Sequence, residues 1–205
     1  TLTDGVFLQV LESARAQPDL EHVLIIEEIN RGNPAQVLGE MLTLLENSKR
    51  SGHDAMELAY RKFAGEKVYV PENLYVVGTM NIADRSLALV DLALRRRFAF
   101  VNLGPNLNEA WVRWCAARGL DTIASTRIQQ AMHALNESIA ADKALGPQFQ
   151  IGHSFVTPAE RERVHDPVKW FADVVHTEIG PLLHEYWFDN PGRAEQEIAQ
   201  LLRTA

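Results

Sequence analysis

The chain has 205 residues, of which 46% are hydrophobic and 23% are charged, and these proportions are ordinary for a soluble globular protein. Its net charge of −7 argues against nonspecific nucleic-acid binding by the chain as a whole, although a local basic patch remains compatible with it. No apolar run approaches the roughly 20 residues of a transmembrane helix, and the N-terminus lacks the pattern of a signal peptide. Cys115 is the single cysteine, which excludes an intrachain disulfide and a cysteine-based zinc site and fits a reducing cytoplasm.

The first predicted elements lead to a pair of carboxylates. Apolar spacing predicts a helix that is capped by Asp4 or Thr3 and ends near Ala16. Residues 23–26 form an apolar run that is typical of a fully buried parallel strand. Glu27 and Glu28 follow directly, at the strand end where open α/β sheets place their ligands. Taken alone, the pair fits either a magnesium and phosphate site or a solvated acidic turn.

The stretch after the carboxylates predicts a helix, a hairpin and a second strand. Asn33 is expected to cap a helix that begins at Pro34, because proline is favoured in the first turn. Residues 46–70 are polar with short β-like pieces at residues 56–60 and 67–70, and they predict a hairpin insertion. Residues 73–79 form another β-rich apolar run, and the neutral amide of Asn81 lies just beyond it.

Three arginines follow a further short helix. The sequence predicts this helix over residues 86–94, then Arg95, Arg96 and Arg97, and then a third strand over residues 98–103. Arginines at the end of a helix stabilise its dipole in some proteins and bind the phosphates of nucleic acid in others. Position alone leaves these alternatives open.

The sequence changes character near Gly104. Beyond it, helices are predicted near residues 107–118, 122–142, 167–188 with a break at Pro181, and 192–203. The second of these helices has one apolar stripe, formed by Ile128, Met132, Leu135 and Ile139. We therefore expect an α/β part over residues 1–104 and an all-helical part over residues 105–205, which contains all four tryptophans as packing residues.

Two segments carry a family resemblance. They are EINRGN, which begins at Glu28, and VPENLYVVGTMNIADRSLALVDLALRRRF, which ends at Phe98. Together they resemble the McrB family, the GTPase subunits of modification-dependent restriction systems within the AAA+ superfamily. That family carries MNTADRS where this chain has MNIADRS, and IGHSF at residues 151–155 is also similar. The resemblance implies the fold class: an α/β, partial AAA+ P-loop NTPase core followed by an all-helical lid.

The resemblance also implies roles for the residues at the strand ends. Glu27 takes the position of the carboxylate that coordinates Mg²⁺, although the family usually has aspartate there. Glu28 matches the residue that activates the attacking water, and Asn81 matches the sensor that hydrogen-bonds the γ-phosphate or the water. Asn30 and Arg31 either orient this water, reach a neighbouring subunit or brace the loop.

Further residues come from the arginine run and from the helical part. By resemblance, Arg96 is the expected finger that reaches the nucleotide of the next subunit, and Arg97 is the second choice. Asp84 and Arg85 belong to the family signature and are expected to support the structure. His153 either approaches the nucleotide from the lid or is a packed or capping histidine.

One part of a nucleotide site is missing from the sequence. The chain contains no GxxxxGK[ST], the loop that cradles phosphates. In this family that loop lies upstream of the matching segments, and the chain begins with threonine rather than methionine. We therefore expect a piece of a longer protein that by itself binds nucleotide weakly or not at all.

The leading hypothesis is a fragment of a motor that hydrolyses GTP, or else ATP, for a DNA-restriction complex. The family implies identical subunits in a ring and a McrC-like nuclease subunit as partners, with DNA bound only through domains outside this chain and no membrane. One alternative is an ATP-dependent AAA+ remodeller. Another is a non-catalytic module that only oligomerises or docks.

Overall fold

The computed structural model describes residues 3–81 and 92–204, and the chain forms two compact units, Thr1–Val101 and Asn102–Ala205. Asp84, Arg85 and most of the helix predicted over residues 86–94 lie outside the described residues. Within the described ranges, no helix combines the length and the apolar character needed to cross a bilayer.

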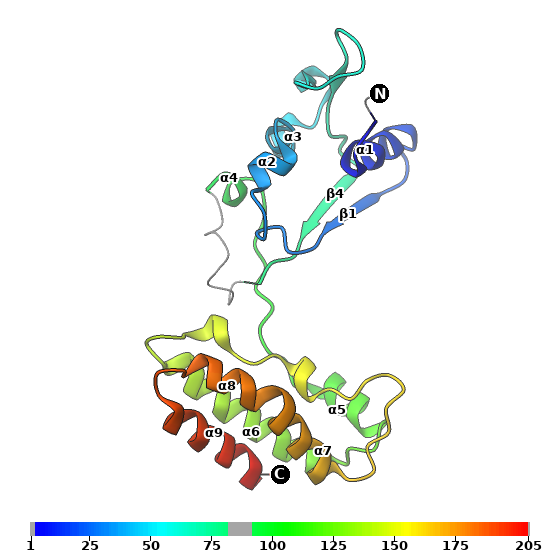
Figure 1. Cartoon of the computed structure of the whole chain (residues 1–205). Helices are drawn as coiled ribbons and strands as arrows, with labels where there is room; N and C mark the ends of the chain where they lie inside the picture. The colour runs from blue at the N-terminus through cyan, green and yellow to red at the C-terminus, as the bar shows by residue number, and fades with distance from the viewer. Residues whose placement is uncertain (1–2, 82–91, 205) are drawn as a thin grey trace. The chain divides into compact units, whose positions relative to one another are not determined.

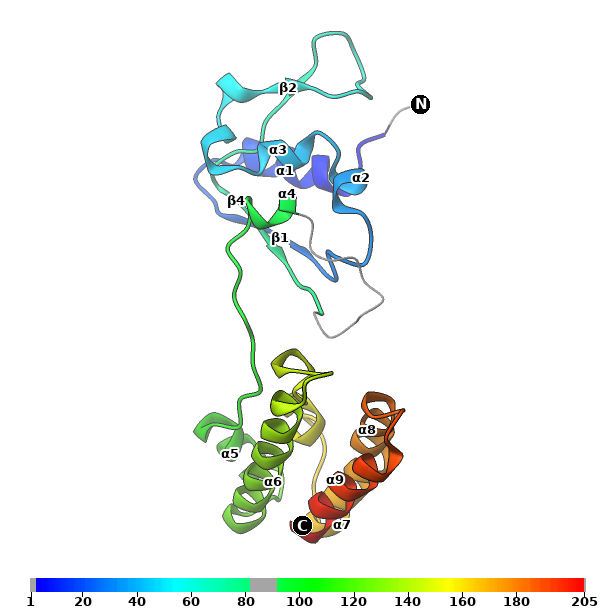
Figure 2. The same cartoon turned by 90° about the vertical axis from the view of Figure 1, so that its left-hand side faces the viewer.

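The first unit is built around two parallel strands, β1 (His22–Ile26) and β4 (Leu74–Gly78). They pair in register along their whole length, from His22 opposite Leu74 to Ile26 opposite Gly78 (Figures 1 and 2). Because the strands are parallel and in register, their carboxyl ends lie next to each other. The residues that follow both strands therefore meet at one edge of the sheet.

Helices cover one face of this sheet. They are α1 (Val6–Ala16), α2 (Pro34–Leu38) and α3 (Met41–Leu44), and Figure 1 shows them on the same side of the strands. The Asn33 side chain accepts the Gln36 backbone N–H at 3.2 Å, which confirms the predicted cap of α2. The core of this unit consists of apolar residues from these helices, from β4, from α4 (Leu92–Arg95) and from the segments next to them: Leu11, Ala14, Leu38, Met41, Leu42, Leu44, Leu45, Val68, Val70, Leu74 and Leu94.

The other face of the sheet is exposed within this unit. Val23 and Ile25 of β1 are 58% and 62% exposed, and Tyr75 and Val77 of β4 are also exposed. The prediction of a fully buried first strand is therefore wrong for this structure. The physical reason is that side chains alternate along a strand, and the described helices of this unit cover only the face with Leu24 and Val76.

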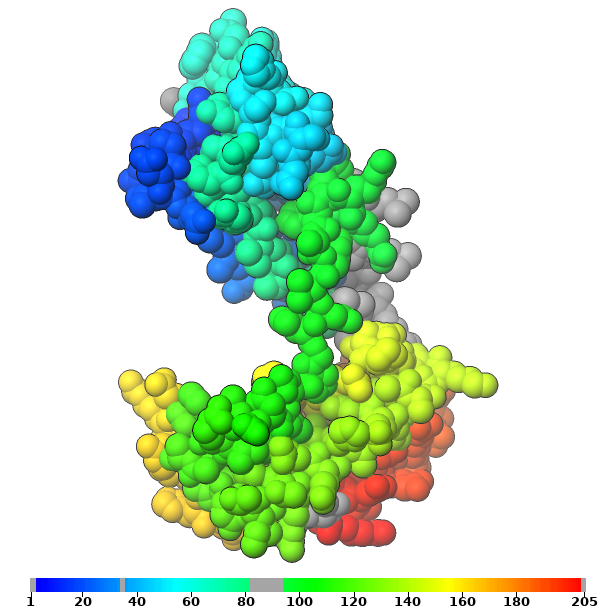
Figure 3. Space-filling view, turned by 180° about the vertical axis from the view of Figure 1, so that it is seen from behind, coloured from blue at the N-terminus to red at the C-terminus, as the bar shows by residue number. Residues whose placement is uncertain are grey.

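The segment between α3 and β4 contains the predicted hairpin, with strands shorter than expected. It comprises η1 (Asn47–Lys49), η2 (Gly52–Asp54) and the antiparallel pair β2 (Met56–Glu57) and β3 (Lys67–Val68). Figure 3 shows α1 in blue and the segment after α3 in cyan on the outer surface of the unit.

After β4, the described residues resume with α4 (Leu92–Arg95). No strand forms over residues 98–103, so the prediction of a third strand there is wrong. A strand needs a neighbour to accept its backbone hydrogen bonds, and no strand among residues 3–81 and 92–204 pairs with this segment.

The second unit is all-helical, as predicted. Its elements are α5 (Glu109–Ala116), α6 (Thr122–Ala141), η3 (Pro147–Phe149), η4 (His153–Val156), α7 (Pro167–Val174), η5 (Val175–Ile179), α8 (Gly180–Tyr186) and α9 (Pro191–Thr204). Four helices begin with a side-chain cap, from Asn108 for α5, Asp121 for α6, Asp166 for α7 and Asn190 for α9. The predicted stripe of α6 is buried, with Ile128, Met132, Leu135 and Ile139 all in the core.

One helix of this unit contains a wider turn. Residues 167–186 form a continuous helix in which η5 is a π-helix between α7 and α8. Pro181 lies two residues after Ile179, the last residue of η5, and proline provides no backbone N–H and crowds the preceding turn. The sequence predicts a break at this proline, and the structure shows a π-turn just before it.

Candidate active site

The candidate site lies where β1 and β4 end. The Thr79 backbone N–H donates to the Ile26 carbonyl at 3.0 Å, and the Ile29 N–H donates back to the Thr79 carbonyl at 2.9 Å. The Thr79 hydroxyl accepts the backbone N–H of Glu28 at 3.2 Å. Thr79 therefore fixes the turn that carries Glu28, a role that sequence analysis did not assign. The sequence feature that could have indicated this role is a residue with a hydroxyl group at the end of a predicted strand.

Glu28 adopts an unusual backbone conformation in this turn. Its φ is 50°, which makes it the single non-glycine residue with a left-handed φ in the described part of the chain. For an L-residue this conformation costs about 1–2 kcal/mol. Such strain persists only where the surrounding contacts impose it, and it is concentrated at functional sites. The strained backbone thus indicates Glu28 as a candidate functional residue, independently of any sequence motif.

The Glu28 carboxylate is paired within the turn. Its Oε2 lies 2.6 Å from Nη1 of Arg31, and the backbone N–H of Arg31 donates to the Glu28 carbonyl at 2.8 Å. The two side chains are 50% and 73% exposed. A pair this exposed contributes between zero and about 1 kcal/mol, so Arg31 can leave the carboxylate at little cost.

Asn30 lies buried between the two strand ends, at 7% exposure. Its Nδ2 donates to the Asn81 carbonyl at 3.5 Å, so it links the turn after β1 to the residues after β4. Its Oδ1 is buried and accepts no hydrogen bond from the described residues. A buried acceptor without a donor costs about 1–3 kcal/mol. A water bound at this edge would remove that cost.

Glu27 is exposed next to this turn, and its carboxylate makes no hydrogen bond or ion pair with residues 3–81 or 92–204. No group of three or more acidic, histidine or cysteine side chains that could hold a metal occurs in the described ranges. Mg²⁺ in nucleotide sites uses one or two carboxylates together with phosphate oxygens and water, so it does not need such a group. The oxygen donors at residues 27 and 28 therefore fit a magnesium ion that accompanies a nucleotide.

The two arginines that sequence analysis proposed as the finger, Arg96 and Arg97, have different surroundings in the structure. Arg97 is 15% exposed and forms an ion pair with Glu46, in which Nη2 and Oε1 are 2.7 Å apart. Arg96 is exposed directly after α4, and its guanidinium has no partner within the described residues. Of the two side chains, Arg96 is thus the one that is available to another molecule.

His153 belongs to the second unit, at the start of η4. Its Nδ1 accepts the backbone N–H of Asn106 at 3.2 Å, and the residue is exposed. It is therefore not a core histidine. The structure brings Glu28, Asn30, Arg31 and Asn81 together in the first unit, with Glu27 beside them, and places His153 in the other unit.

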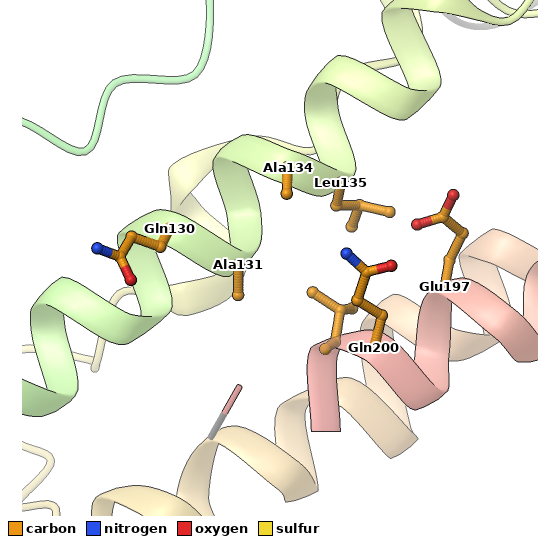
Figure 4. A pocket seen from close by; sticks show the side chains of 7 residues that line it. Gln130, Ala131, Ala134, Leu135, Glu197 and Gln200 are labelled. Atoms are coloured by element: carbon orange, nitrogen blue, oxygen red, sulfur yellow. The ribbon is translucent and has the colours of Figure 1, made fainter. Parts of the chain in front are cut away.

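The second unit also contains a groove between α6 and α9, with a cavity volume of about 160 Å³. Figure 4 shows that the small side chains Ala131 and Ala134 leave room there, opposite Gln200. Its single ionisable lining residue, Glu197, accepts a 2.5 Å hydrogen bond from the Ser138 hydroxyl. The groove offers no acid–base pair and is a poor candidate for catalysis.

Comparison with known proteins agrees with this division of the chain. Residues 2–98 match the AAA domain family (dynein-related subfamily), and residues 127–195 match the family of the McrB alpha-helical lid domain. The two matches cover the strand-end site and the segment with His153.

Two relatives are similar in sequence. The Type IV methyl-directed restriction enzyme EcoKMcrB subunit of Escherichia coli (strain K12) is 37% identical over 201 residues, which are 97% of this chain and 44% of the relative. The Type II restriction enzyme BsuMI component YdiS of Bacillus subtilis (strain 168) is 36% identical over 105 residues, which are 47% of this chain and 31% of the relative. The chain thus spans less than half the length of these relatives. It belongs to the McrB family of AAA+ proteins, of which it carries part of the AAA core and the helical lid.

Proposed function

We propose that this chain forms the water-activating and phosphate-sensing part of a nucleoside triphosphatase that drives a McrB-like DNA-restriction system. The observation that carries the proposal is the hydrogen-bonded turn at the ends of two parallel strands, which holds Glu28, Asn30 and Asn81 together. Open α/β sheets bind their ligands at this edge. The family to which the chain belongs adds that the ligand is a nucleotide.

Glu28 is the proposed general base. Its carboxylate would accept a proton from the water that attacks the γ-phosphate. Arg31 holds the carboxylate in the present structure, and the weakness of an exposed ion pair allows it to release Glu28 when a nucleotide arrives. Arg31 would then orient the water or reach the neighbouring subunit.

Asn30 and Asn81 are the proposed positioning residues for that water and for the γ-phosphate. The buried Oδ1 of Asn30 is an acceptor without a donor in the described residues, as a water-binding group would be. The Asn81 side chain can donate to a phosphate oxygen without adding charge. The hydrogen bond from Asn30 to the Asn81 carbonyl supports a joint action of the two amides.

Glu27 is the proposed ligand of Mg²⁺. When bound, magnesium would neutralise charge on the β- and γ-phosphate oxygens. Glutamate is longer than the usual aspartate by one methylene, so the carboxylate reaches further from the strand end. The exposure of Glu27 and its lack of a partner in the described residues support this assignment.

Arg96 is the proposed finger that acts on the nucleotide of a neighbouring subunit. A guanidinium suits the charge that develops on the transferred phosphoryl group. The ion pair between Arg97 and Glu46 supports Arg96 over Arg97 for this role, because it engages Arg97 within its own unit. A finger that acts in trans requires a neighbouring subunit, and the proposed assembly is a ring of identical subunits.

The proposed substrate is GTP, with ATP as the second choice, and the proposed partner is a McrC-like nuclease subunit. These follow from the family resemblance and from restriction enzymes among the relatives. DNA would be bound by domains outside this chain.

The test is phosphate release from GTP and from ATP by the full-length protein, in comparison with its Glu28→Gln variant. We expect turnover that prefers GTP and falls at least about 100-fold in the variant, because a positioned general base contributes that much. Glu21→Gln is a matched control, since Glu21 is exposed at the opposite end of β1. ATP-selective turnover would point to a remodeller, and turnover that survives Glu28→Gln would refute the proposed base.

A further inference from the structure

The end of β4 contacts three consecutive residues of the turn that follows β1. The Thr79 hydroxyl accepts the Glu28 backbone N–H at 3.2 Å, and the Thr79 carbonyl accepts the Ile29 N–H at 2.9 Å. The Asn81 carbonyl accepts a hydrogen bond from the Asn30 side chain at 3.5 Å. The residues after one strand therefore shape the turn that carries the proposed base.

Gly78, the last residue of β4, allows this turn to approach closely. A Cβ atom added at this position would lie 3.1 Å from both Cδ1 and Cγ2 of Ile29. Carbon atoms in favourable contact are about 3.5–4.0 Å apart, so a larger residue would push Ile29 away from the strand. Gly78 and Thr79 thus act on the same turn, the first by leaving space and the second by accepting a hydrogen bond.

The Thr79 hydroxyl binds the residue whose backbone is strained, because Glu28 has a φ of 50°. Consecutive side chains of a regular strand point to opposite faces, so Glu27 and Glu28 in an extended strand would lie on opposite sides of the sheet. A left-handed residue leaves this alternation, and both carboxylates can then serve one site at the strand end. Such a conformation persists only where contacts impose it, and the Thr79 hydroxyl provides one of these contacts.

We infer that Thr79 is a positioning residue for the proposed reaction, whose hydroxyl holds the backbone of Glu28 so that the carboxylate is placed for proton transfer. This inference rests on the proposed function. A general base must lie within hydrogen-bond reach of the attacking water, and a displacement of about 1 Å can cost about 100-fold in rate. A purely structural Thr79 would stabilise the turn to the same extent whether or not the carboxylate is present.

The test is a double-mutant cycle on kcat for phosphate release from GTP by the full-length protein, with Thr79→Val and Glu28→Gln. Thr79→Val keeps the shape of the side chain and removes the acceptor. We expect it to lower kcat about tenfold and to change KM less than about twofold, because the contact places the base and not the substrate. In the Glu28→Gln background, the same change should lower the residual kcat less than about twofold, because the carboxylate is already lost.

Two variants show whether the hydroxyl itself is responsible. Thr79→Ser keeps the acceptor and should retain kcat within about twofold of the unmodified protein. Thr43→Val is the matched control, since Thr43 is half-buried on α3 and its hydroxyl makes no hydrogen bond with residues 3–81 or 92–204. It should leave kcat unchanged.

A further variant keeps the inference testable if Thr79→Val disturbs the fold, which amide hydrogen exchange of β1 and β4 would report. Gly78→Ala shifts the same turn through Ile29. It should lower kcat when Glu28 is present and change the residual kcat of Glu28→Gln less than about twofold.

The outcomes separate this inference from the proposed function. Equal fold losses of kcat with and without the Glu28 carboxylate would overturn the inference, and so would a Thr79→Ser variant as impaired as Thr79→Val. If Thr79→Val leaves kcat unchanged while Glu28→Gln abolishes phosphate release, the inference fails and the proposed function stands. If Glu28→Gln retains turnover, it is the proposed function that fails.

Discussion

The two units of the chain differ in how fully their own residues pair the buried polar groups and cover the apolar surface. In the helical unit, α5, α6 and α7 begin with side-chain caps, and the buried amide of Asn136 uses both its donor and its acceptor. In the α/β unit, the N-cap residue of α1 is Gly5, which provides no side-chain hydrogen bond. One sheet face is exposed, and the Oδ1 of Asn30 has no donor in the described residues. The first unit therefore has an exposed apolar sheet face and a buried acceptor that its own described residues do not cover or pair.

This difference predicts that the helical unit withstands perturbation of the other unit and is sensitive to its own core. Phe171 of α7 is 1% exposed, and Phe171→Ala should destabilise this unit by about 3–5 kcal/mol through the cavity that it leaves. All four tryptophans lie in this unit, so tryptophan fluorescence during urea unfolding follows it selectively.

The control for this prediction is Val168→Ala on the same helix, where the side chain is exposed and the effect should stay within about 0.5 kcal/mol. Amide hydrogen exchange of β1 and β4 should remain as in the unmodified chain. Equal loss of protection in the strands would show that the two units unfold as one, and the comparison would no longer hold.

A second prediction concerns the strain in the α/β unit. Glu28→Gly and Glu28→Ala both remove the carboxylate, but only glycine accepts the φ of 50° without a steric cost. We expect the glycine variant to be more stable than the alanine variant by about 1 kcal/mol, measured from hydrogen exchange of the β1 and β4 amides. Equal stability of the two variants would mean that the turn relaxes when the carboxylate is lost.

The smallest expected effect is a pH dependence in the helical unit. The indole N–H of Trp187 donates to the Asp142 carboxylate at 2.9 Å and, together with the backbone N–H of Ala144 and the nearby Arg193, keeps the pKa of Asp142 below its usual 3.8. A lowered pKa in the folded state means that the charged carboxylate stabilises the fold above about pH 4 and that this contribution is lost as the pH falls through the lowered value.

Asp142→Asn should therefore reduce the stability of the helical unit at about pH 6, by less than about 1 kcal/mol, and should matter less at about pH 2. The measurement is the thermal midpoint of tryptophan fluorescence at both pH values. An effect of the same size at both would show that the charge of Asp142 contributes nothing.

Some features of the chain follow from local sequence and others do not. The cap at Asn33, the buried stripe of α6 and the two polar strand ends depend on residue types at short spacing, so the sequence predicts them correctly. The missing strand over residues 98–103 and the exposed face of β1 depend on what else packs nearby, which local patterns do not specify.

In the candidate site, too, the sequence predicts the residues near the strand ends but not the contacts between distant residues. Glu27, Glu28 and Asn81 could be named from their places after the strands, but the ion pair of Arg97 with Glu46 joins residues far apart in the chain. Asn136 is a polar residue on the buried face of α6, and a polar residue at such a position was the available signal that it pairs with another buried polar group. Its partner at Ile151 could be found only from the structure.

The π-turn at Val175–Ile179 has a consequence for how the lid changes during evolution. A π-turn holds one residue more than an α-turn, and here it ends directly before Gly180, where an added Cβ would lie 2.9 Å from the Val175 carbonyl oxygen. Loss of one residue from this turn would leave a regular α-helix with the flanking apolar residues still on one face. When lid sequences of distant relatives are aligned, a single-residue gap is therefore expected to be tolerated here, whereas one inside α6 would rotate its buried stripe out of the core.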